Sequence, residues 1–211
     1  MIATNQGLGT LEQATDRDFF VWVDPTNFSI KHHVALVGSF YGGPAIPSLV
    51  DGPEGLPFIA NPNEVPQSLS PFHSNVVRDY RVEWNLESLR YREFGHLPSR
   101  LQALFLLDTK ADALRYSQIH PDHVKGRILK RGRSVGACQY SMHDTAWIDF
   151  MRLPHSMDQE TIQSVGRAYW RGVKVETCEL TTMGKPWHGE SCPEVLFYGT
   201  LQFPNKALTA D

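Results

Sequence analysis

The segment at residues 193–199, with the sequence Pro-Glu-Val-Leu-Phe-Tyr-Gly, constrains the fold of this chain more than any other stretch. Its apolar alternation predicts a strand that places Val195 and Phe197 on one face. A single carboxylate, Glu194, stands at the entrance to this strand. Because a buried charge is costly unless it is solvated or paired, Glu194 either faces solvent at the strand end or projects into a functional cleft.

The 211 residues are expected to form one domain at residues 19–211, preceded by a loose polar arm at residues 1–18. Three cysteines without a CxxC spacing argue against a disulfide framework and for a reducing compartment. No apolar run approaches the roughly 20 residues that span a bilayer, and the N-terminus lacks the pattern of a cleaved signal. We therefore expect a cytoplasmic protein, or an effector exported without a cleaved signal.

Short apolar runs separated by turn residues predict many strands and a few helices, an order typical of an α+β domain. Strands are expected at residues 19–23, 34–37, 101–107, 127–130, 135–140, 147–151, 173–180 and 194–203. Helices are expected at residues 84–94, at 110–119 with Asp108 or Thr109 as the N-cap, and at 158–170 with Asp158 as the N-cap. A loop is expected at residues 181–193.

Prolines and glycines are concentrated between residues 38 and 79. These residues fit poorly into helices and strands. A loop of this length inside a compact domain is usually functional or mobile. We expect a long irregular insertion at about residues 38–79.

Three positions far apart in the sequence stand at the boundaries of predicted strands: Trp22, the pair Ser99–Arg100, and Glu194. Functional groups often occupy such boundaries on a rigid scaffold. The alternative is that Trp22 belongs to the core, Ser99 to a loop and Arg100 to the surface. Arg100 precedes seven residues without a charge, so its guanidinium lies near the core and needs a carboxylate or phosphate partner.

Five basic residues fall within the nine positions 125–133, where a hairpin between two strands is predicted: Lys125, Arg127, Lys130, Arg131 and Arg133. Such a hairpin either contacts the phosphates of a nucleic acid or is simply a solvated surface.

His120 and His123 have the spacing of metal ligands, but Pro121 breaks a helix that would present both imidazoles on one face. Zinc sites need three or four ligands, so no metal site is expected.

Four short blocks, taken in their order and spacing, resemble a poorly characterised bacterial and phage family of the ADP-ribosyltransferase-like superfamily. They are LPSRLQALF at residues 97–105, DT with ADA at 108–113, AYWRG at 168–172 and PEVLFYG at 193–199. The resemblance covers roughly residues 19–203. It implies a split β-sandwich with flanking helices that holds NAD in a cleft, and an NAD-dependent mono-ADP-ribosyltransferase that modifies a protein or nucleic acid.

The resemblance also implies roles for single residues. Glu194 matches the catalytic glutamate of the superfamily, and Ser99 matches the serine that shapes the nicotinamide pocket. The loop at residues 181–193 occupies the position of target recognition, with Trp187 and His188 as candidate contacts. Glu194 would stabilise the positive charge that develops on the ribose as nicotinamide leaves, as in glycoside hydrolysis.

Aromatic rings are expected to flank the nicotinamide, with Trp22, Tyr116 and Trp170 as candidates, and Arg100 is expected to meet the pyrophosphate. The chain departs from the superfamily at the first strand, where Trp22 stands in place of the usual His or Arg. It also has Cys192 where members that modify arginine have Gln or Glu, so an arginine acceptor is less expected.

The alternative function is a non-catalytic domain that binds nucleic acid or a partner through residues 125–133.

Overall fold

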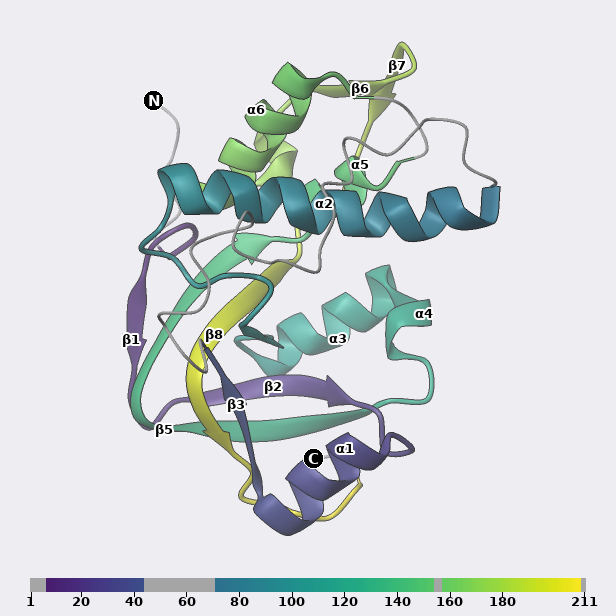
Figure 1. Cartoon of the computed structure of the whole chain (residues 1–211). Coiled ribbons are helices and arrows are strands. Elements are labelled where there is room, and N and C mark those ends of the chain that lie inside the picture. The colour runs from purple at the N-terminus through teal and green to yellow at the C-terminus, as the bar shows by residue number, and fades with distance from the viewer. Residues whose placement is uncertain (1–6, 44–70, 154–156, 210–211) are drawn as a thin grey trace.

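The computed structural model describes residues 7–43, 71–153 and 157–209, and these residues form a mixed α+β fold (Figure 1). In chain order the elements are β1 (Glu12–Ala14), β2 (Asp18–Val23), α1 (Phe28–Lys31), the π-helical turn η1 (His32–Val37), β3 (Ser39–Gly42), α2 (Pro71–Glu93), β4 (Leu104–Leu106), α3 (Lys110–Ile119), α4 (Pro121–Val124), β5 (Ile128–Asp144), α5 (Ala146–Met151), α6 (Gln159–Trp170), the 3₁₀ turn η4 (Val175–Thr177), β6 (Leu180–Thr182), β7 (Lys185–Trp187) and β8 (Pro193–Gln202).

The main sheet is antiparallel and is organised around its two longest strands, β5 and β8. β1 and β2 pair with opposite halves of β5, while β4 and β3 pair with opposite halves of β8. A bulge between Val135 and Gln139 interrupts the β5–β8 ladder, and β5 turns sharply in this region (Figure 1). Gly199 has a φ of +133°, and a Cβ there would lie 2.5 Å from Cys138 Sγ, so the close approach of the two strands requires glycine.

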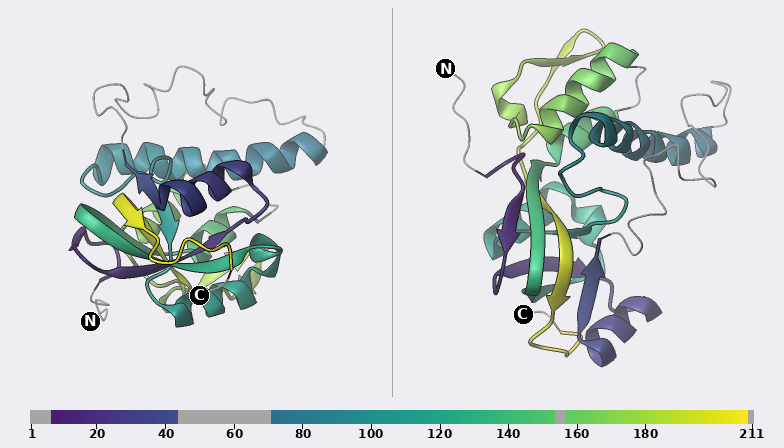
Figure 2. Two further views of the ribbon diagram at one scale, coloured as in Figure 1. Left: turned by 90° about the horizontal axis from the view of Figure 1, so that it is seen from below. Right: turned by 60° about the vertical axis from the view of Figure 1, so that its left-hand side comes forward.

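The helices lie at both ends and on one side of this sheet. Helices α2, α5 and α6 gather with the β6–β7 hairpin at one end, α1 lies at the other, and α3–α4 lies between them (Figures 1 and 2). The end formed by α2, α5 and α6 has its own apolar core, which includes Leu86, Trp147 and Trp170. β8 contributes Val195, Leu196 and Phe197 to the interior, and each such buried side chain contributes about 1.5–3 kcal/mol.

Four predicted elements are confirmed with nearly the predicted bounds: β2, α3, α6 and β8. Their ends carry clear local signals. The side chain of Thr109 accepts a hydrogen bond from the Asp112 N–H, and the Asp112 side chain accepts one from the Thr109 N–H, which completes a capping box at α3. Asp158 caps α6 through the Thr161 N–H.

Three predicted strands are wrong. Residues 34–37 belong to η1, residues 147–151 form α5, and residues 173–180 contain η4 and reach β6 only at Leu180. Helix α5 is buried on most of its circumference, so its short apolar run carries no helical period that distinguishes it from a strand. The predicted helix at 84–94 is the end of the longer α2, and the predicted strand at 101–107 is reduced to β4.

The described parts of the predicted arm and of the predicted insertion both contain regular structure. Within residues 1–18, β1 pairs with β5, and Arg17 forms an ion pair with Asp108, so this part of the chain is not a loose arm. Within the predicted insertion at 38–79, β3 and the first residues of α2 are regular, and residues 44–70 lie outside the described part of the chain. Among the described helices, none has the length and hydropathy needed to cross a bilayer.

Candidate active site

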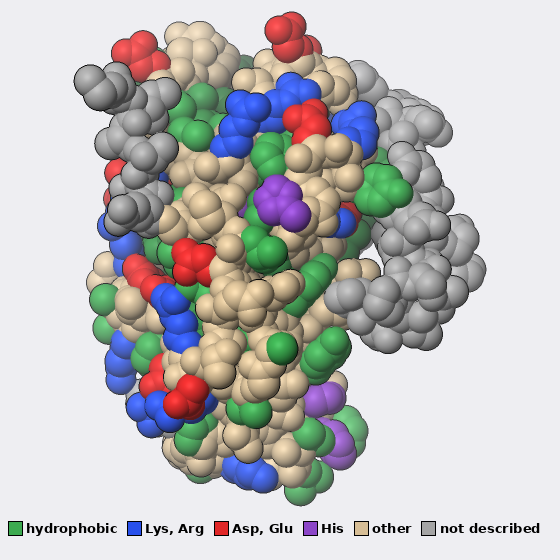
Figure 3. Space-filling view, turned by 90° about the vertical axis from the view of Figure 1, so that its left-hand side faces the viewer, with side chains coloured by type: hydrophobic (Ala, Val, Ile, Leu, Met, Phe, Trp, Pro, Cys, Tyr) green, Lys and Arg blue, Asp and Glu red, His purple; other side chains and the backbone are tan. Residues whose placement is uncertain are grey.

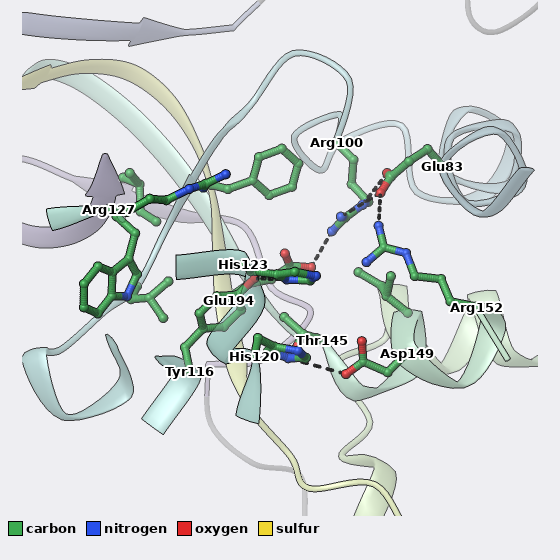
Figure 4. Close-up of a pocket in the computed structure, with 15 residues that line it drawn as sticks. Glu83, Arg100, Tyr116, His120, His123, Arg127, Thr145, Asp149, Arg152 and Glu194 are labelled. Carbon is green, nitrogen blue, oxygen red and sulfur yellow. Dashed lines mark hydrogen bonds and ion pairs between the residues drawn. The ribbon is translucent and has the colours of Figure 1, made fainter. Parts of the chain in front are cut away.

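A pocket of about 330 Å³ lies where the start of β8 meets α2, α3–α4 and α5 (Figure 4). Its apolar wall comes from β2 and β4, with Trp22, Leu106 and Leu107. Its remaining walls are rich in charged and titratable side chains, and this volume is at the lower end of the range for small-molecule sites. The pocket is therefore the part of the described structure in which aromatic, acidic and basic side chains converge.

Glu194 enters this pocket from the second residue of β8. Pro193 precedes it at the first strand position, where the missing N–H of proline costs no ladder bond. The Glu194 side chain is buried, and its Oε1 accepts hydrogen bonds from the Arg100 guanidinium and from Tyr169 Oη, the latter at 2.7 Å. Its Oε2 accepts no hydrogen bond from any described residue, so this oxygen is available to a ligand in the pocket. Burial raises the pKa of Glu194, and Arg100 and Tyr169 oppose that rise.

Arg100 holds Glu194 in place and is itself fixed by Glu83 of α2. Its Nε and Nη2 bind the two oxygens of Glu83 at 2.7 and 3.0 Å, and its Nη1 also donates to Tyr169 Oη at 2.7 Å. The guanidinium lies over the ring of Phe105 at 4.8 Å. The partners of Arg100 include two carboxylates, and four of its five N–H groups donate inside the protein (Figure 4).

Tyr169 is oriented by a buried histidine on β5. His143 Nδ1 lies 3.0 Å from the Tyr169 carbonyl oxygen, so this nitrogen carries the proton, and Nε2 accepts from Ser141 Oγ at 2.8 Å. The two rings stack with centroids 4.6 Å apart. Burial lowers the pKa of His143 to about 3, so the ring is neutral at pH 7. His143 therefore fixes the residue that donates to Glu194.

The wall formed by α3 and α4 presents two histidines. His120 ends α3, and Pro121 opens α4 at its first helical position, where its missing N–H is tolerated. Pro121 ends the helix as expected, yet the imidazoles of His120 and His123 are stacked with centroids 5.1 Å apart, because α4 begins directly after α3. His120 Nε2 lies 3.4 Å from Asp149 Oδ2, and Tyr116 Oη lies 3.0 Å from His123 Nδ1. No group of three metal-ligating side chains occurs in the described ranges.

Four of the residues predicted to be catalytic or to bind NAD line this pocket together: Trp22, Arg100, Tyr116 and Glu194. The other two of that set, Ser99 and Trp170, lie elsewhere. Ser99 is buried in the turn before β4, where its Oγ accepts from the Leu101 N–H at 3.1 Å and its own N–H donates to Tyr198 Oη. Trp170 is fully buried in the core and donates to the Leu86 carbonyl, so it is not a pocket wall.

The predicted target-recognition loop at 181–193 is partly a hairpin, formed by β6 and β7. Trp187 packs on Phe150 of α5 with ring centroids 5.0 Å apart. His188 is exposed. Neither side chain lines the pocket around Glu194.

The predicted basic hairpin at 125–133 is wrong, because β5 runs through it as one continuous strand. Lys130 is fully buried and donates to the Thr209 carbonyl. Arg131 and Arg133 form ion pairs with Asp18 at 3.7 and 2.9 Å, because β2 lies beside β5. On the face shown in Figure 3, basic and acidic side chains lie side by side. Lys125 and Arg127 precede β5, and Arg127 lines the pocket.

The sequence did not single out several residues of the site for catalysis. Glu83, Asp149, Arg152 and the pair His120–His123 line the pocket, and Tyr169 does not line it but donates to Glu194. Tyr169 belongs to the block AYWRG, and the two histidines have a recognisable spacing, so these two signals were present. Glu83 and Asp149 carry no local signal, because their roles depend on how α2 and α5 pack. A comparison of the chain with models of known families and with curated proteins finds no match to either.

Proposed function

We propose that the protein is an NAD-dependent mono-ADP-ribosyltransferase and that Glu194 is its catalytic carboxylate. The observation that carries this proposal is that only one carboxylate oxygen of Glu194 is hydrogen-bonded. Oε1 accepts from Arg100 and Tyr169, and Oε2 is open to the pocket. A carboxylate fixed in this way is preorganised for a charge that develops in front of it. A glutamate at the start of the last strand is also the arrangement that the family resemblance implies.

The chemistry that suits this carboxylate is cleavage of the bond between nicotinamide and ribose. The electron pair of that bond moves to the pyridinium nitrogen, so nicotinamide leaves neutral and positive charge develops at the ribose carbon, as in glycoside hydrolysis. Oε2 of Glu194 would bind a ribose hydroxyl and stabilise that charge. Arg100 supports this role by opposing protonation of the buried Glu194, whose pKa burial raises.

The remaining pocket residues suit the other parts of NAD. The Trp22 and Tyr116 rings line the pocket and offer surfaces for the nicotinamide ring. Because Arg100 is occupied by Glu83 and Glu194, we assign the pyrophosphate contact to Arg127 instead. The Arg127 side chain is exposed and lines the pocket, and no hydrogen bond or ion pair joins its guanidinium to the described residues. Arginine binds phosphate oxygens through a planar fork of donors.

The pocket is favoured over the alternative of a nucleic-acid-binding domain. That alternative depended on five exposed basic side chains at 125–133. Lys130 is buried, and Arg131 and Arg133 have acidic partners. These partners leave little positive charge for a phosphate backbone, which nucleic-acid binding requires.

The test is nicotinamide release from NAD by the wild type and by Glu194→Gln. The variant keeps the size of the side chain and an oxygen for Arg100, so we expect an unchanged melting temperature and a loss of release on the order of 10³-fold. Glu190→Gln is the matched control, because Glu190 is exposed and does not line the pocket. Release by Glu194→Gln at the wild-type rate would refute the assignment of Glu194. The absence of release by the wild type, together with no thermal stabilisation by NAD, would refute the function.

A further inference from the structure

The wall opposite the sheet contains a histidine that the role of Glu194 does not use. Resting on the function proposed above, we propose that His123 is the general base that takes the proton of the attacking acceptor, and that the acceptor is a hydroxyl group. Glu194 and His123 would then have separate roles. Glu194 would stabilise the positive charge on the ribose, and His123 would activate the nucleophile.

The position of His123 carries this proposal. His123 and Glu194 line the same pocket of about 330 Å³, so one bound molecule can contact both (Figure 4). The ring is held on two sides, by stacking on His120 and by the contact of Nδ1 with Tyr116 Oη at 3.0 Å. Nε2 of His123 forms no hydrogen bond with the described residues, and the side chain is exposed, so this nitrogen is accessible to a substrate. A general base needs such a fixed ring with one open nitrogen.

The charges around His123 keep the ring neutral near pH 7. Burial lowers its pKa, and the neighbouring His120 and Arg152 lower it further. Arg127, before β5, acts in the same direction, while Asp149 of α5 opposes the others. A neutral imidazole has a free electron pair to accept a proton.

The proposal assigns one tautomer to His123. Burial raises the pKa of Tyr116 to about 12, so the phenol stays protonated at neutral pH. We assign Nδ1–H of His123 as the donor to Tyr116 Oη across their 3.0 Å contact. In this tautomer the electron pair of His123 is on Nε2, the open nitrogen. Once His123 is protonated, Asp149 lies close enough to stabilise the imidazolium. Tyr116 is therefore a positioning residue for His123.

The step balances without a further reagent. The hydroxyl oxygen of the acceptor forms a bond with the ribose carbon while the bond from that carbon to nicotinamide breaks. The electron pair of the broken bond neutralises the pyridinium, and the hydroxyl proton moves to Nε2 of His123. The imidazolium then releases this proton to water.

The need for a base defines the class of acceptor. A carboxylate is already anionic at pH 7 and needs no proton removed, and a guanidinium is a delocalised cation that would be repelled by Arg127 and Arg152 of the same pocket. A hydroxyl is neutral and gains from a base that acts as the new bond forms. This agrees with Cys192, which stands where members that modify arginine have Gln or Glu.

The inference is tested with NAD and water as the hydroxyl acceptor, by following nicotinamide release. His123→Gln is expected to lower kcat on the order of 100-fold with little change in KM for NAD. Imidazole in the buffer is expected to restore part of the activity of His123→Ala. Tyr116→Phe should give a smaller loss of kcat, because His123 remains as the base but no longer has the Tyr116 hydroxyl to hold its tautomer. His32→Gln, at an exposed histidine of η1 outside the pocket, is the matched control.

The pH profile provides a second readout. In the wild type, kcat should fall at low pH as both Glu194 and His123 become protonated, and His123→Gln should lose the His123 part of this fall. Release that depends on Glu194 but is unchanged in His123→Gln would overturn this inference alone. The absence of any release by the folded wild type would overturn the proposed function and this inference with it.

Discussion

Two buried carboxylates lie on neighbouring rungs where β5 ends and β8 begins, and their surroundings differ. Asp144 Oδ1 accepts from the N–H groups of Ala146 and Cys192, and Oδ2 accepts from the Val175 N–H and from Ser191 Oγ, all within 2.7 to 3.1 Å. Glu194, opposite His143 in the same ladder, uses one oxygen and leaves the other open to the pocket. Both side chains are buried, so burial alone does not identify a catalytic group.

The difference indicates separate roles. Asp144 joins the end of β5 to the segments around η4 and before β8, and both of its oxygens are saturated by these segments. Such an acid stabilises the structure and has no capacity left for a ligand. Glu194 is held firmly at one oxygen, and this leaves the second for chemistry. The comparison therefore predicts that Asp144 variants lose stability first, whereas Glu194 variants lose activity first.

The largest expected effect on stability is that of Asp144→Asn. The amide keeps one acceptor oxygen and turns an N–H₂ group toward N–H and O–H donors, so two buried donors lose their partner. We expect the free energy of unfolding to fall by about 4 kcal/mol, measured by denaturant titration. Glu194→Gln is the matched control and should stay within about 1 kcal/mol of the wild type. An equal fall in the free energy of unfolding of both variants would contradict the distinction between Asp144 and Glu194.

The second prediction concerns His143, which supports Glu194 through Tyr169. Its folded-state pKa of about 3 lies below the unfolded value of 6.5, so below pH 6.5 the unfolded chain takes up a proton that the folded chain does not. The wild type should therefore lose stability as pH falls from 6.5 towards 3, on the order of 1 kcal/mol for each pH unit. Denaturant titrations of the wild type and of His143→Gln at several pH values measure this. If both have the same pH dependence in that window, the buried neutral state of His143 is wrong.

The smallest expected effect separates two arginines of the basic segment. Arg127→Gln should raise KM for NAD about tenfold with kcat nearly unchanged, because a phosphate contact affects the ground state and the transition state alike. Arg131→Gln should leave KM unchanged, because Arg131 pairs with Asp18 at the surface. Its loss should change stability by less than about 1 kcal/mol. Equal KM values for the two variants would remove Arg127 from the site.

The sequence predicted the elements whose ends carry local signals. Helices α3 and α6 have side-chain caps at Thr109 and Asp158, and β2 and β8 are bounded by turn residues. It did not predict α5, whose surface is mostly buried, or the continuity of β5 through its basic residues. Arg133 pairs with Asp16 and with Asp18. Asp18 is 115 residues away in the chain and reaches Arg133 through the pairing of β2 with β5.

The site was predictable in part for the same reason. Trp22, Arg100, Tyr116 and Glu194 each stood out by position or by resemblance, and they line one pocket. Glu83, which pairs with Arg100, Tyr169, which donates to Glu194, and Asp149, which lies beside His120, come from helices whose packing no short pattern reveals. Ser99 had the expected sequence position, but its hydroxyl is used by the turn before β4.

The most direct test of the open oxygen of Glu194 is a crystal structure of Glu194→Gln with NAD, because this variant should bind NAD without consuming it. We expect the nicotinamide ring against Trp22 and Tyr116, and a hydroxyl of its ribose within hydrogen-bond distance of the side chain at position 194. NAD bound elsewhere on the protein, or a side chain at position 194 that contacts only Arg100 and Tyr169 while NAD is present, would contradict this.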